Sequence, residues 1–306
     1  MMIKNVLLYL LFLIAGLIFV FSAYLKLFPI EMLEFAIADT GIFSWSFSAI
    51  LARFLIGFEF LLGILLICKL LPRYTLALSL LTLVFFTFYL IYLWIFRGND
   101  GNCNCFGIQL AMTPLQSILK NLILIAILAF LFFKSKFKPP RKAFIIISVI
   151  VVILCIAVPY IMMPLRASSV SANREVGSTL DLNPLYDADY EHIPSLELRE
   201  SKWLVMFASA GCHHCINAGY KLTVLKRQIP ELPVYFFING DEDEISHYHM
   251  LTNSAHIPYS IMMKEKILYY THGRLPEIYL IENQIIKGND NYYDLDEKEL
   301  TKWLSE

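Results

Sequence analysis

Hydrophobic and polar positions divide this chain of 306 residues into two parts of different character. Up to about residue 164, apolar residues form long runs, and each is near the roughly 20 residues that an α-helix needs to cross a bilayer. The runs cover residues 6–28, 47–68, 74–96, 115–133 and 143–163. Residues 165–306 instead mix charges, turns and short apolar runs. The pattern therefore predicts five transmembrane helices followed by a soluble domain.

The charge of the connecting loops predicts how the chain is oriented, because short loops rich in Lys and Arg stay on the cytoplasmic side of a membrane. Basic residues precede the first run and fill the second and fourth connections, at Lys4, Lys69, Arg73, Lys134, Lys136, Lys138, Arg141 and Lys142. The first connection is mainly acidic. In the third, the single basic residue, Arg97, is balanced by the acidic residue Asp100. We therefore expect a cytoplasmic N-terminus. After an odd number of crossings, the loop after Arg97 and everything beyond Pro164 lie outside.

The ends of the apolar region set the expected domain boundaries. The first run continues into Lys26 and Phe28 without a small-residue cleavage site, so we expect a retained span and not a removed signal. Residues 166–177 are polar and Ser-rich, as a flexible tether is. The expected domains are a transmembrane domain over 1–164, a linker over 165–180 and an extracytoplasmic domain over 181–306. In a bacterium this is a multi-pass inner-membrane protein with a periplasmic domain.

The soluble part reads as an α/β domain. A buried-strand pattern over Trp203–Ser209 is followed by Cys212-His213-His214-Cys215 and a helical pattern over 216–228. Further elements are predicted as strands over 234–238, 277–281 and 284–286 and a closing helix over 295–304. The acidic run 241–244 is typical of a solvated helix start, and four histidines are expected on the surface: His247, His249, His256 and His272.

Two close cysteine pairs, Cys103/Cys105 and Cys212/Cys215, fall on the same outer side in this topology. Such a pair can close a disulfide and reopen it when a thiolate attacks, so two pairs within reach form an electron relay. A static loop staple is the alternative for Cys103/Cys105, although so short a loop gains little stability from closure. Metal binding is a weaker alternative for Cys103/Cys105. Zinc is disfavoured at Cys212/Cys215, because the soluble part has no second close pair to complete four ligands. We therefore expect thiol-disulfide exchange and no metal.

The position of Cys212 before a predicted helix favours it as the attacking sulfur. A helix N-terminus stabilises a thiolate through its dipole and its free N–H groups. Cys215 is then the resolving thiol, and His214 and His213 can add positive charge beside the thiolate. His213 is also compatible with a merely solvated side chain.

The soluble part resembles the thioredoxin-fold oxidoreductases, close in pattern to the TlpA-like group, with Cys212 and Cys215 matching the active-site pair. Pro276 stands where that fold has its cis-proline loop, and His214 resembles the histidine of the strongly oxidising DsbA-type site. Gly211 and His213 replace the tryptophan and proline common around such pairs, which leaves the redox potential open.

The membrane part resembles the MauE/DoxX-like family, which is related in architecture to the vitamin K epoxide reductase group. The resemblance covers about residues 1–135 and rests on Phe21–Leu27, Glu59–Gly63, Cys103–Gly107 and Lys120-Asn121. In methylamine utilisation, MauE is paired with a separate thioredoxin-like protein for disulfide maturation. The chain looks like a fusion of the two, with a fifth span added. The resemblance implies a membrane quinone as terminal acceptor, but the in-membrane Cys-x-x-Cys of the epoxide reductase group is missing here.

Charged residues inside a bilayer are costly and need a reason. Lys26, Arg53 and Glu59 are expected to face the bundle interior, where Lys26 or Arg53 would stabilise a thiolate or hold a quinone oxygen and Glu59 would relay a proton. A structural pair of Arg53 with Glu59, with Lys26 reaching the membrane surface, is the alternative. The isolated Cys68 and Cys155 are expected to be packing residues.

The sequence thus predicts a membrane-bound thiol-disulfide oxidoreductase that serves the oxidative maturation of extracytoplasmic client proteins with cysteines. A reductant relay for client or cytochrome thiols and a membrane-tethered assembly factor without turnover are also compatible with the pattern. The net charge of −1, without a basic patch, argues against nucleic acid as a partner. The 58% hydrophobic content instead indicates contact with membrane lipid.

Overall fold

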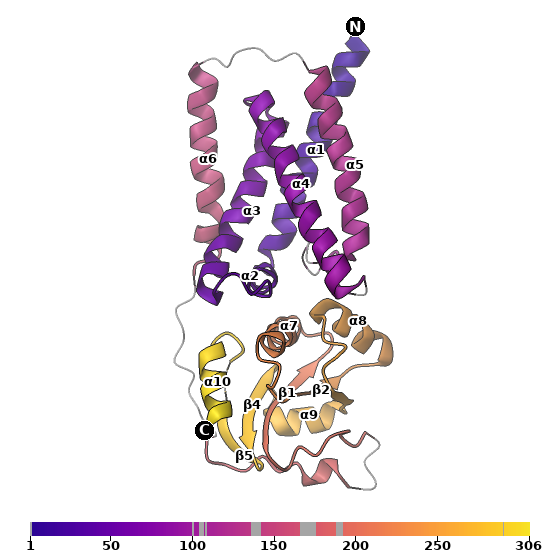
Figure 1. Ribbon diagram of the computed structural model, residues 1–306, viewed down its shortest axis with the longest axis vertical. Helices are drawn as coiled ribbons and strands as arrows, with labels where there is room; N and C mark the ends of the chain where they lie inside the picture. The colour runs from indigo at the N-terminus through magenta and orange to yellow at the C-terminus, as the bar shows by residue number, and fades with distance from the viewer. Residues whose placement is uncertain are drawn as a thin grey trace. The chain divides into compact units, whose positions relative to one another are not determined.

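The computed structural model describes residues 2–306 apart from 100, 104–106, 108, 136–141, 166–175, 188–191 and 290. It consists of two compact units, Met1–Leu165 and Arg166–Glu306. Each unit has hydrophobic clusters of its own. The first is all-helical and the second contains a β-sheet (Figure 1).

Within its described residues, the N-terminal unit has five helices long and apolar enough to cross a membrane, as the sequence predicts. Its helices are α1 (Met2–Leu27), α2 (Glu31–Ala38), α3 (Trp45–Ile67), α4 (Pro72–Arg97), α5 (Pro114–Lys134) and α6 (Lys142–Met162). The short helix α2 was not predicted. It lies in the acidic first connection, where an eight-residue helix leaves too short a periodic pattern to recognise.

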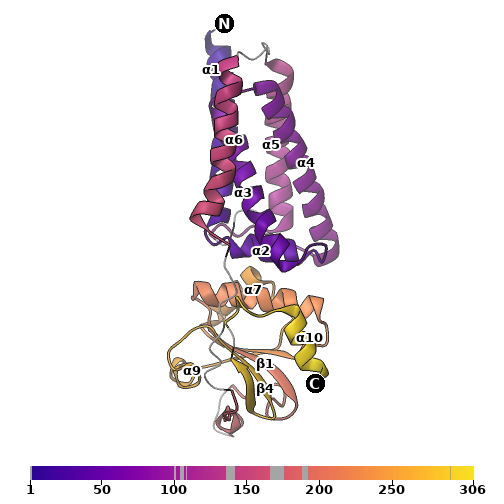
Figure 2. The same cartoon turned by 90° about the vertical axis from the view of Figure 1, so that its left-hand side faces the viewer.

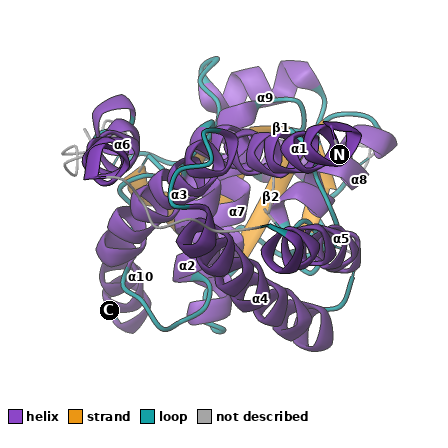
Figure 3. Ribbon diagram, turned by 90° about the horizontal axis from the view of Figure 1, so that it is seen from above, coloured by secondary structure: helices purple, strands orange, loops and turns teal. Residues whose placement is uncertain are grey.

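Small residues allow α3 to pack closely against two neighbours. A Cβ on Gly63 would lie 2.8 Å from the carbonyl oxygen of Gly16 on α1, and a Cβ on Gly57 would lie 2.7 Å from that of Cys155 on α6. Backbones at this separation exclude larger side chains, as is common between membrane helices. The helix α6 therefore packs on α3, beside the bundle of the other long helices (Figure 3).

The start of α5 is defined by its own sequence. Thr113 and Gln116 form a capping box, in which each side chain accepts a hydrogen bond from the backbone N–H of the other residue. Pro114 occupies the first helical position, where its missing N–H costs nothing. These features hold the first turn of α5 in place.

The C-terminal unit is a five-stranded sheet with helices on both faces. Its elements are η1 (Asn183–Leu185), β1 (Lys202–Ser209), α7 (His213–Gln228), β2 (Val234–Asn239), α8 (Glu242–Thr252), β3 (Tyr259–Ile261), α9 (Lys264–Thr271), β4 (Glu277–Glu282), β5 (Ile285–Asn289) and α10 (Glu297–Ser305). The strand order is β3-β2-β1-β4-β5. Strands β1, β2 and β3 are parallel, and β4 is antiparallel to β1 and β5. This is the thioredoxin-like topology, so the predicted fold class is confirmed.

The central strand β1 is covered on both sides, with α7 on one face of the sheet and α9 on the other (Figure 2). Residues 204–208 are all fully buried. On the α9 side, the ring of Phe207 stacks on Phe237 and Tyr270, with 5.1 Å between ring centroids in each pair. Burial on both faces explains why β1 reads as a continuous apolar run. The strand thus holds the turn after Ser209 rigidly.

Two expectations about single residues are wrong. His249 is buried and not on the surface, because it lies on the inner side of α8, where its Nδ1 is 2.8 Å from the hydroxyl of Ser254. Cys68 is exposed at the C-cap of α3 and is therefore not a packing residue, whereas Cys155 is buried against α3.

Helix α9 and strand β3 were not predicted, since both are short and partly polar.

Candidate functional site

The Cys212/Cys215 pair lies where β1 passes into α7. Cys212 is the N-cap of α7, and its Sγ accepts a hydrogen bond from the backbone N–H of Cys215, with 3.3 Å between nitrogen and sulfur. Cys215 is fully buried, and the N–H of Ser209 donates to its sulfur at 3.5 Å. The first sulfur is half-buried and accessible, and the second lies beneath it. This is the arrangement of an attacking thiol with a resolving thiol.

The surroundings of the pair separate the two thiols in acidity. The pKa of Cys212 falls from 9.0 to about 6, mainly because the Cys215 thiol donates a hydrogen bond to its sulfur. The backbone N–H groups of Cys215 and His214 and the charge of His214 lower it further, against the opposing effect of burial. The same hydrogen bond and burial raise the pKa of Cys215. At neutral pH the reduced pair is therefore a thiolate at Cys212 and a thiol at Cys215.

The two histidines between the cysteines differ in their contacts. Both are exposed, but His214 Nδ1 lies 3.4 Å from the hydroxyl of Tyr292. Tyr292 is buried and packs against the ring of Tyr293. Tyr292 was not singled out from the sequence, because it follows the cysteines by more than 70 residues and only the fold brings it to α7.

Pro276 stands directly before β4, and the peptide bond between Leu275 and Pro276 is cis. The next residue, Glu277, pairs with Phe207 near the end of β1 that leads to the cysteines. The sheet thus places Pro276 near the same end of β1. A catalytic role for Pro276 stays a prediction.

A buried tyrosine supports the resolving cysteine and was also missed. The hydroxyl of Tyr248 on α8 donates a hydrogen bond to the carbonyl oxygen of Cys215, with 3.0 Å between the oxygens. This ring fits only because Gly219 has no side chain, since a Cβ there would lie 2.0 Å from the Tyr248 oxygen. A glycine in a helix interior, one turn after the cysteines, was the available signal.

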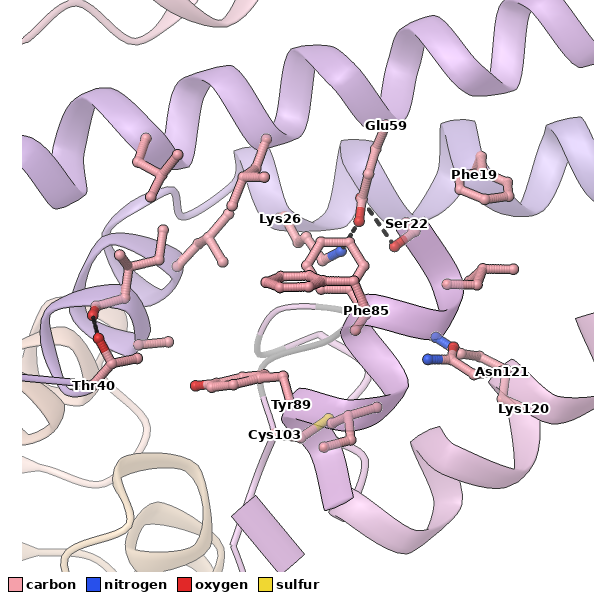
Figure 4. A pocket seen from close by; sticks show the side chains of 18 of the residues that line it. Phe19, Ser22, Lys26, Thr40, Glu59, Phe85, Tyr89, Cys103, Lys120 and Asn121 are labelled. Carbon is pink, nitrogen blue, oxygen red and sulfur yellow. Dashed lines mark hydrogen bonds and ion pairs between the residues drawn. The ribbon is translucent and has the colours of Figure 1, made fainter. Parts of the chain in front are cut away.

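The membrane unit contains a cavity of about 450 Å³ (Figure 4). Most of its lining is apolar, from α1, α2, α3, α4 and α5. The exceptions include an ion pair between Lys26 and Glu59, and Ser22, whose hydroxyl donates to Glu59 at 3.3 Å. Cys103 lines the same cavity and belongs to a buried cluster with Leu90, Leu93 and Ile118. Three of the predicted residues, Lys26, Glu59 and Cys103, therefore line one cavity.

The alternative interpretation, a structural pair of Arg53 with Glu59, is wrong. Residues six positions apart on a helix point to different faces, and Glu59 faces α1, where it pairs with Lys26. Lys26 is only 9% exposed and does not reach the surface. Arg53 does not line the cavity and binds Glu34 of α2 at 2.6 Å and the carbonyl oxygen of Met163 at 2.6 Å. It ties α3 to α2 and to the end of α6.

Cys103 is buried next to the first turn of α5. Its sulfur lies 3.0 Å from the hydroxyl oxygen of Ser117, and its N–H donates to the carbonyl oxygen of Met112 at 2.9 Å. The side chain of Asn102 holds the same loop, accepting from Met112 N–H and donating to Gly107. Cys105, the other member of the predicted pair, lies outside the described residues.

Comparison with known families confirms the expected resemblance of the membrane part. A family model described as Methylamine utilisation protein MauE matches residues 4–134. Protein TlpB of Flavobacterium psychrophilum is 27% identical over 293 residues, which covers 80% of each chain. The chain is therefore similar to a MauE-type protein in its first part and to TlpB over most of its length.

Three solved structures are similar to the thioredoxin-like part. They are a secreted disulfide oxidoreductase from Mycobacterium tuberculosis (12% identity, 34% of this chain and 81% of that chain, TM-score 0.29), a thiol:disulfide interchange protein from Bacteroides sp. (16%, 35% and 76%, 0.31) and the thioredoxin domain of a thiol-disulfide oxidoreductase from Bacteroides vulgatus (15%, 42% and 95%, 0.32). The chain thus joins a helical unit with five candidate membrane spans to a thioredoxin-like unit in which the pKa of Cys212 is lowered.

Proposed function

We propose that this protein is a membrane-bound thiol-disulfide oxidoreductase that oxidises client proteins through Cys212/Cys215 and passes the electrons to Cys103/Cys105. The observation that carries this proposal is the difference in acidity and exposure between the two thiols of the Cys212/Cys215 pair. Cys212 is accessible and has a pKa of about 6, while Cys215 is buried and keeps its proton. A sulfur of low pKa is a good leaving group, which favours passing a disulfide to a client.

The proposed exchange with a client balances in two steps. A client thiolate attacks Cys212 of the Cys212–Cys215 disulfide, a new S–S bond to the client forms, and Cys215 leaves with the electron pair and takes up a proton. A second client thiolate then attacks the client sulfur of this mixed disulfide, and Cys212 leaves as its stable thiolate. The client is oxidised by two electrons, and the Cys212/Cys215 pair is reduced by two.

A membrane quinone is the proposed terminal acceptor for the Cys103/Cys105 dithiol. The cavity supports this proposal, because it offers apolar walls together with the buried ammonium of Lys26, the carboxylate of Glu59 and the sulfur of Cys103. A quinone supplies an acceptor for two electrons and two protons. Lys26 would hold a quinone oxygen, and Glu59 would move a proton. Arg53 is committed to α2 and α6 and is not assigned to the acceptor.

The quinone proposal is tested on purified full-length protein in detergent. A short-chain quinone should oxidise the reduced Cys103/Cys105 pair, and Lys26→Met should slow this oxidation at least tenfold while oxidation by oxidised glutathione stays unchanged. Equal slowing with both oxidants would mean a folding defect. An unaltered rate with the quinone would remove Lys26 from the acceptor site.

The proposed location is the bacterial inner membrane, with the N-terminus in the cytoplasm and the thioredoxin-like domain in the periplasm. The charge bias of the loops supports this orientation. An impermeant maleimide added to intact spheroplasts should label Cys212 and leave Cys68 unlabelled until lysis. The reverse order of labelling would overturn the orientation and, with it, the relay.

The relay itself is tested by removing the resolving thiol. In Cys215→Ser, attack by Cys212 on another disulfide should stop at a mixed disulfide that is visible on a non-reducing gel. We expect an internal adduct, lost in Cys103→Ser/Cys105→Ser, and intermolecular adducts with secreted clients. The redox state of the wild-type Cys212/Cys215 pair in cells gives the direction of electron flow. An oxidase keeps this pair mainly as a disulfide, and a reductase keeps it mainly as thiols. Clients bound without any adduct would favour the assembly factor.

A further inference from the structure

In the membrane unit, the sulfur of Cys103 lies in contact with the hydroxyl of Ser117. The two side chains lie 14 positions apart in sequence, and their sulfur and oxygen are 3.0 Å apart. Ser117 is fully buried and Cys103 is 8% exposed. A polar contact shielded from water in this way is electrostatically stronger than the same contact in solvent.

The hydroxyl of Ser117 is directed at the sulfur and not at its own helix. Some hydroxyls on the other membrane helices donate to the carbonyl oxygen four residues earlier, as Thr87 does to Leu83 and Ser148 does to Phe144. The carbonyl oxygen four residues before Ser117 belongs to Thr113 and accepts the backbone N–H of Ser117. Among the described residues, the Ser117 hydroxyl contacts the sulfur of Cys103.

The position of this contact favours negative charge on the sulfur. Ser117 belongs to the first turn of α5, the positive end of the helix dipole. The capping box and Pro114 satisfy this end of the helix and hold the turn that carries Ser117. The sulfur of Cys103 thus has beside it a hydroxyl that can donate a hydrogen bond and the first turn of a helix, and both favour a thiolate over a thiol.

We infer that Ser117 is a catalytic residue that donates a hydrogen bond to the thiolate of Cys103 and makes Cys103 the leaving sulfur when the Cys103–Cys105 disulfide opens. This inference rests on the proposed relay and names the chemistry of its second pair. The thiolate of Cys212 attacks Cys105, the Cys212–Cys105 bond forms, and the Cys103–Cys105 bond breaks with its electron pair going to Cys103. Cys215 then loses its proton to the solvent and attacks Cys212, and Cys105 leaves as the second thiolate. Two electrons pass from the Cys212/Cys215 dithiol to the membrane pair.

Stabilising the thiolate of Cys103 favours the reduced pair, so Ser117 should raise its reduction potential. A hydrogen bond to a charged group is worth about a factor of ten or more in equilibrium. Ser117→Ala should therefore lower the equilibrium constant for reduction of Cys103/Cys105 about tenfold, which is about 30 mV for a two-electron couple.

The experiment uses the full chain with Cys212→Ser and Cys215→Ser, so that the membrane pair is measured without the relay. The protein is equilibrated in glutathione buffers, alkylated differentially, and the peptide with both cysteines is quantified by mass spectrometry. Ser79→Ala is the matched control, because Ser79 on α4 is equally buried and its hydroxyl has no hydrogen-bond partner among the described residues. Ser117→Thr keeps the hydroxyl and should keep the wild-type potential.

The outcomes separate this inference from the proposed function. A lower potential in Ser117→Ala alone supports the inference, even if the intact chain then shows no exchange between its two pairs. Equal potentials for wild type, Ser117→Ala and Ser79→Ala would overturn it. In Cys215→Ser, an adduct mapped to Cys212–Cys105 supports it, and one mapped to Cys212–Cys103 contradicts it. A membrane pair that forms no disulfide at any glutathione ratio would overturn both the inference and the relay.

Discussion

The hydroxyl of Tyr248 donates a hydrogen bond to the carbonyl oxygen of Cys215, with 3.0 Å between the two oxygens. Tyr248 is fully buried on α8, so the bond anchors the first turn of α7 to its neighbouring helix. The position of the resolving sulfur therefore depends on how closely α7 and α8 pack. That packing can be tested at Gly219.

Replacing Gly219 by alanine should destabilise the thioredoxin-like unit. The new Cβ would lie 2.0 Å from the Tyr248 oxygen, so α7 and α8 must move apart. Overpacking of this kind costs about 1–3 kcal/mol, and here it also strains the bond to Cys215. Thermal unfolding of the full-length protein should show a lower midpoint. Gly211→Ala is the control, because nothing lies within 4 Å of a Cβ at that position. Equal midpoints for the two variants would contradict the close packing.

The rate of alkylation of Cys212 should follow a pKa of about 6. The thiolate is the nucleophile, so the rate with iodoacetamide should rise through pH 6 and level off near neutral pH. Cys215 should stay unmodified over this range, because burial and its hydrogen bond to Cys212 raise its pKa. Similar alkylation rates for the two cysteines at pH 7 would argue against Cys212 as the attacking thiol and Cys215 as the resolving thiol. Mass spectrometry of the two sites at each pH provides the measurement.

The stability of the reduced protein should depend on pH in the same region. The pKa of Cys212 is about 6 in the folded state and 9.0 as its reference, so between these values the unfolded chain binds more protons. The contribution of Cys212 to the free energy of unfolding should therefore grow from pH 6 towards pH 9 and be lost below pH 6. Denaturant unfolding of the reduced protein checks this. Cys212→Ser should remove the part of this pH dependence that Cys212 contributes.

Removing the His214 side chain should raise the pKa of Cys212 and make the pair less oxidising. His214 contributes a backbone hydrogen bond and a nearby charge, and the alanine variant removes only the charge. The rise in the pKa of Cys212 should be small, because His214 is exposed and its charge is screened by solvent and salt. Tyr292→Phe tests whether the contact at 3.4 Å holds the ring in place. His213→Ala should change the pKa of Cys212 less than His214→Ala does. A larger effect of His213→Ala would mean that His213, and not His214, stabilises the thiolate.

Breaking the buried ion pair in the membrane unit should be costly. Glu59→Gln leaves the ammonium of Lys26 buried without its counter-charge, and loss of one partner of such a pair costs about 3–5 kcal/mol. The double variant Lys26→Met/Glu59→Gln should recover part of this loss. Unfolding midpoints of the four proteins in detergent give the coupling between the two residues. Additive effects would mean that the two charges do not stabilise each other.

Local pattern was enough to predict much of this protein. The five long apolar helices follow from runs of residues that are adjacent in sequence, and the turn at Cys212 follows from a strand pattern, two cysteines and a helix pattern in direct succession. The N-terminal position of Cys212 on α7 also needs no long-range information, because a helix carries its dipole wherever it packs. Short elements such as β3 and α9 were missed for the converse reason, since too few residues repeat to show a period.

Partners far apart in the chain were decided only by the tertiary structure. Lys26 and Glu59 are 33 positions apart, and nothing in either helix says which charge faces which. The sequence alone also allowed Arg53 as the partner of Glu59, and only the packing of α1, α2 and α6 around α3 separates the two. Ser117 beside Cys103 and Tyr248 beneath Cys215 belong to the same class. A hydrogen bond needs two groups within about 3 Å, and only the folded chain brings such distant residues that close.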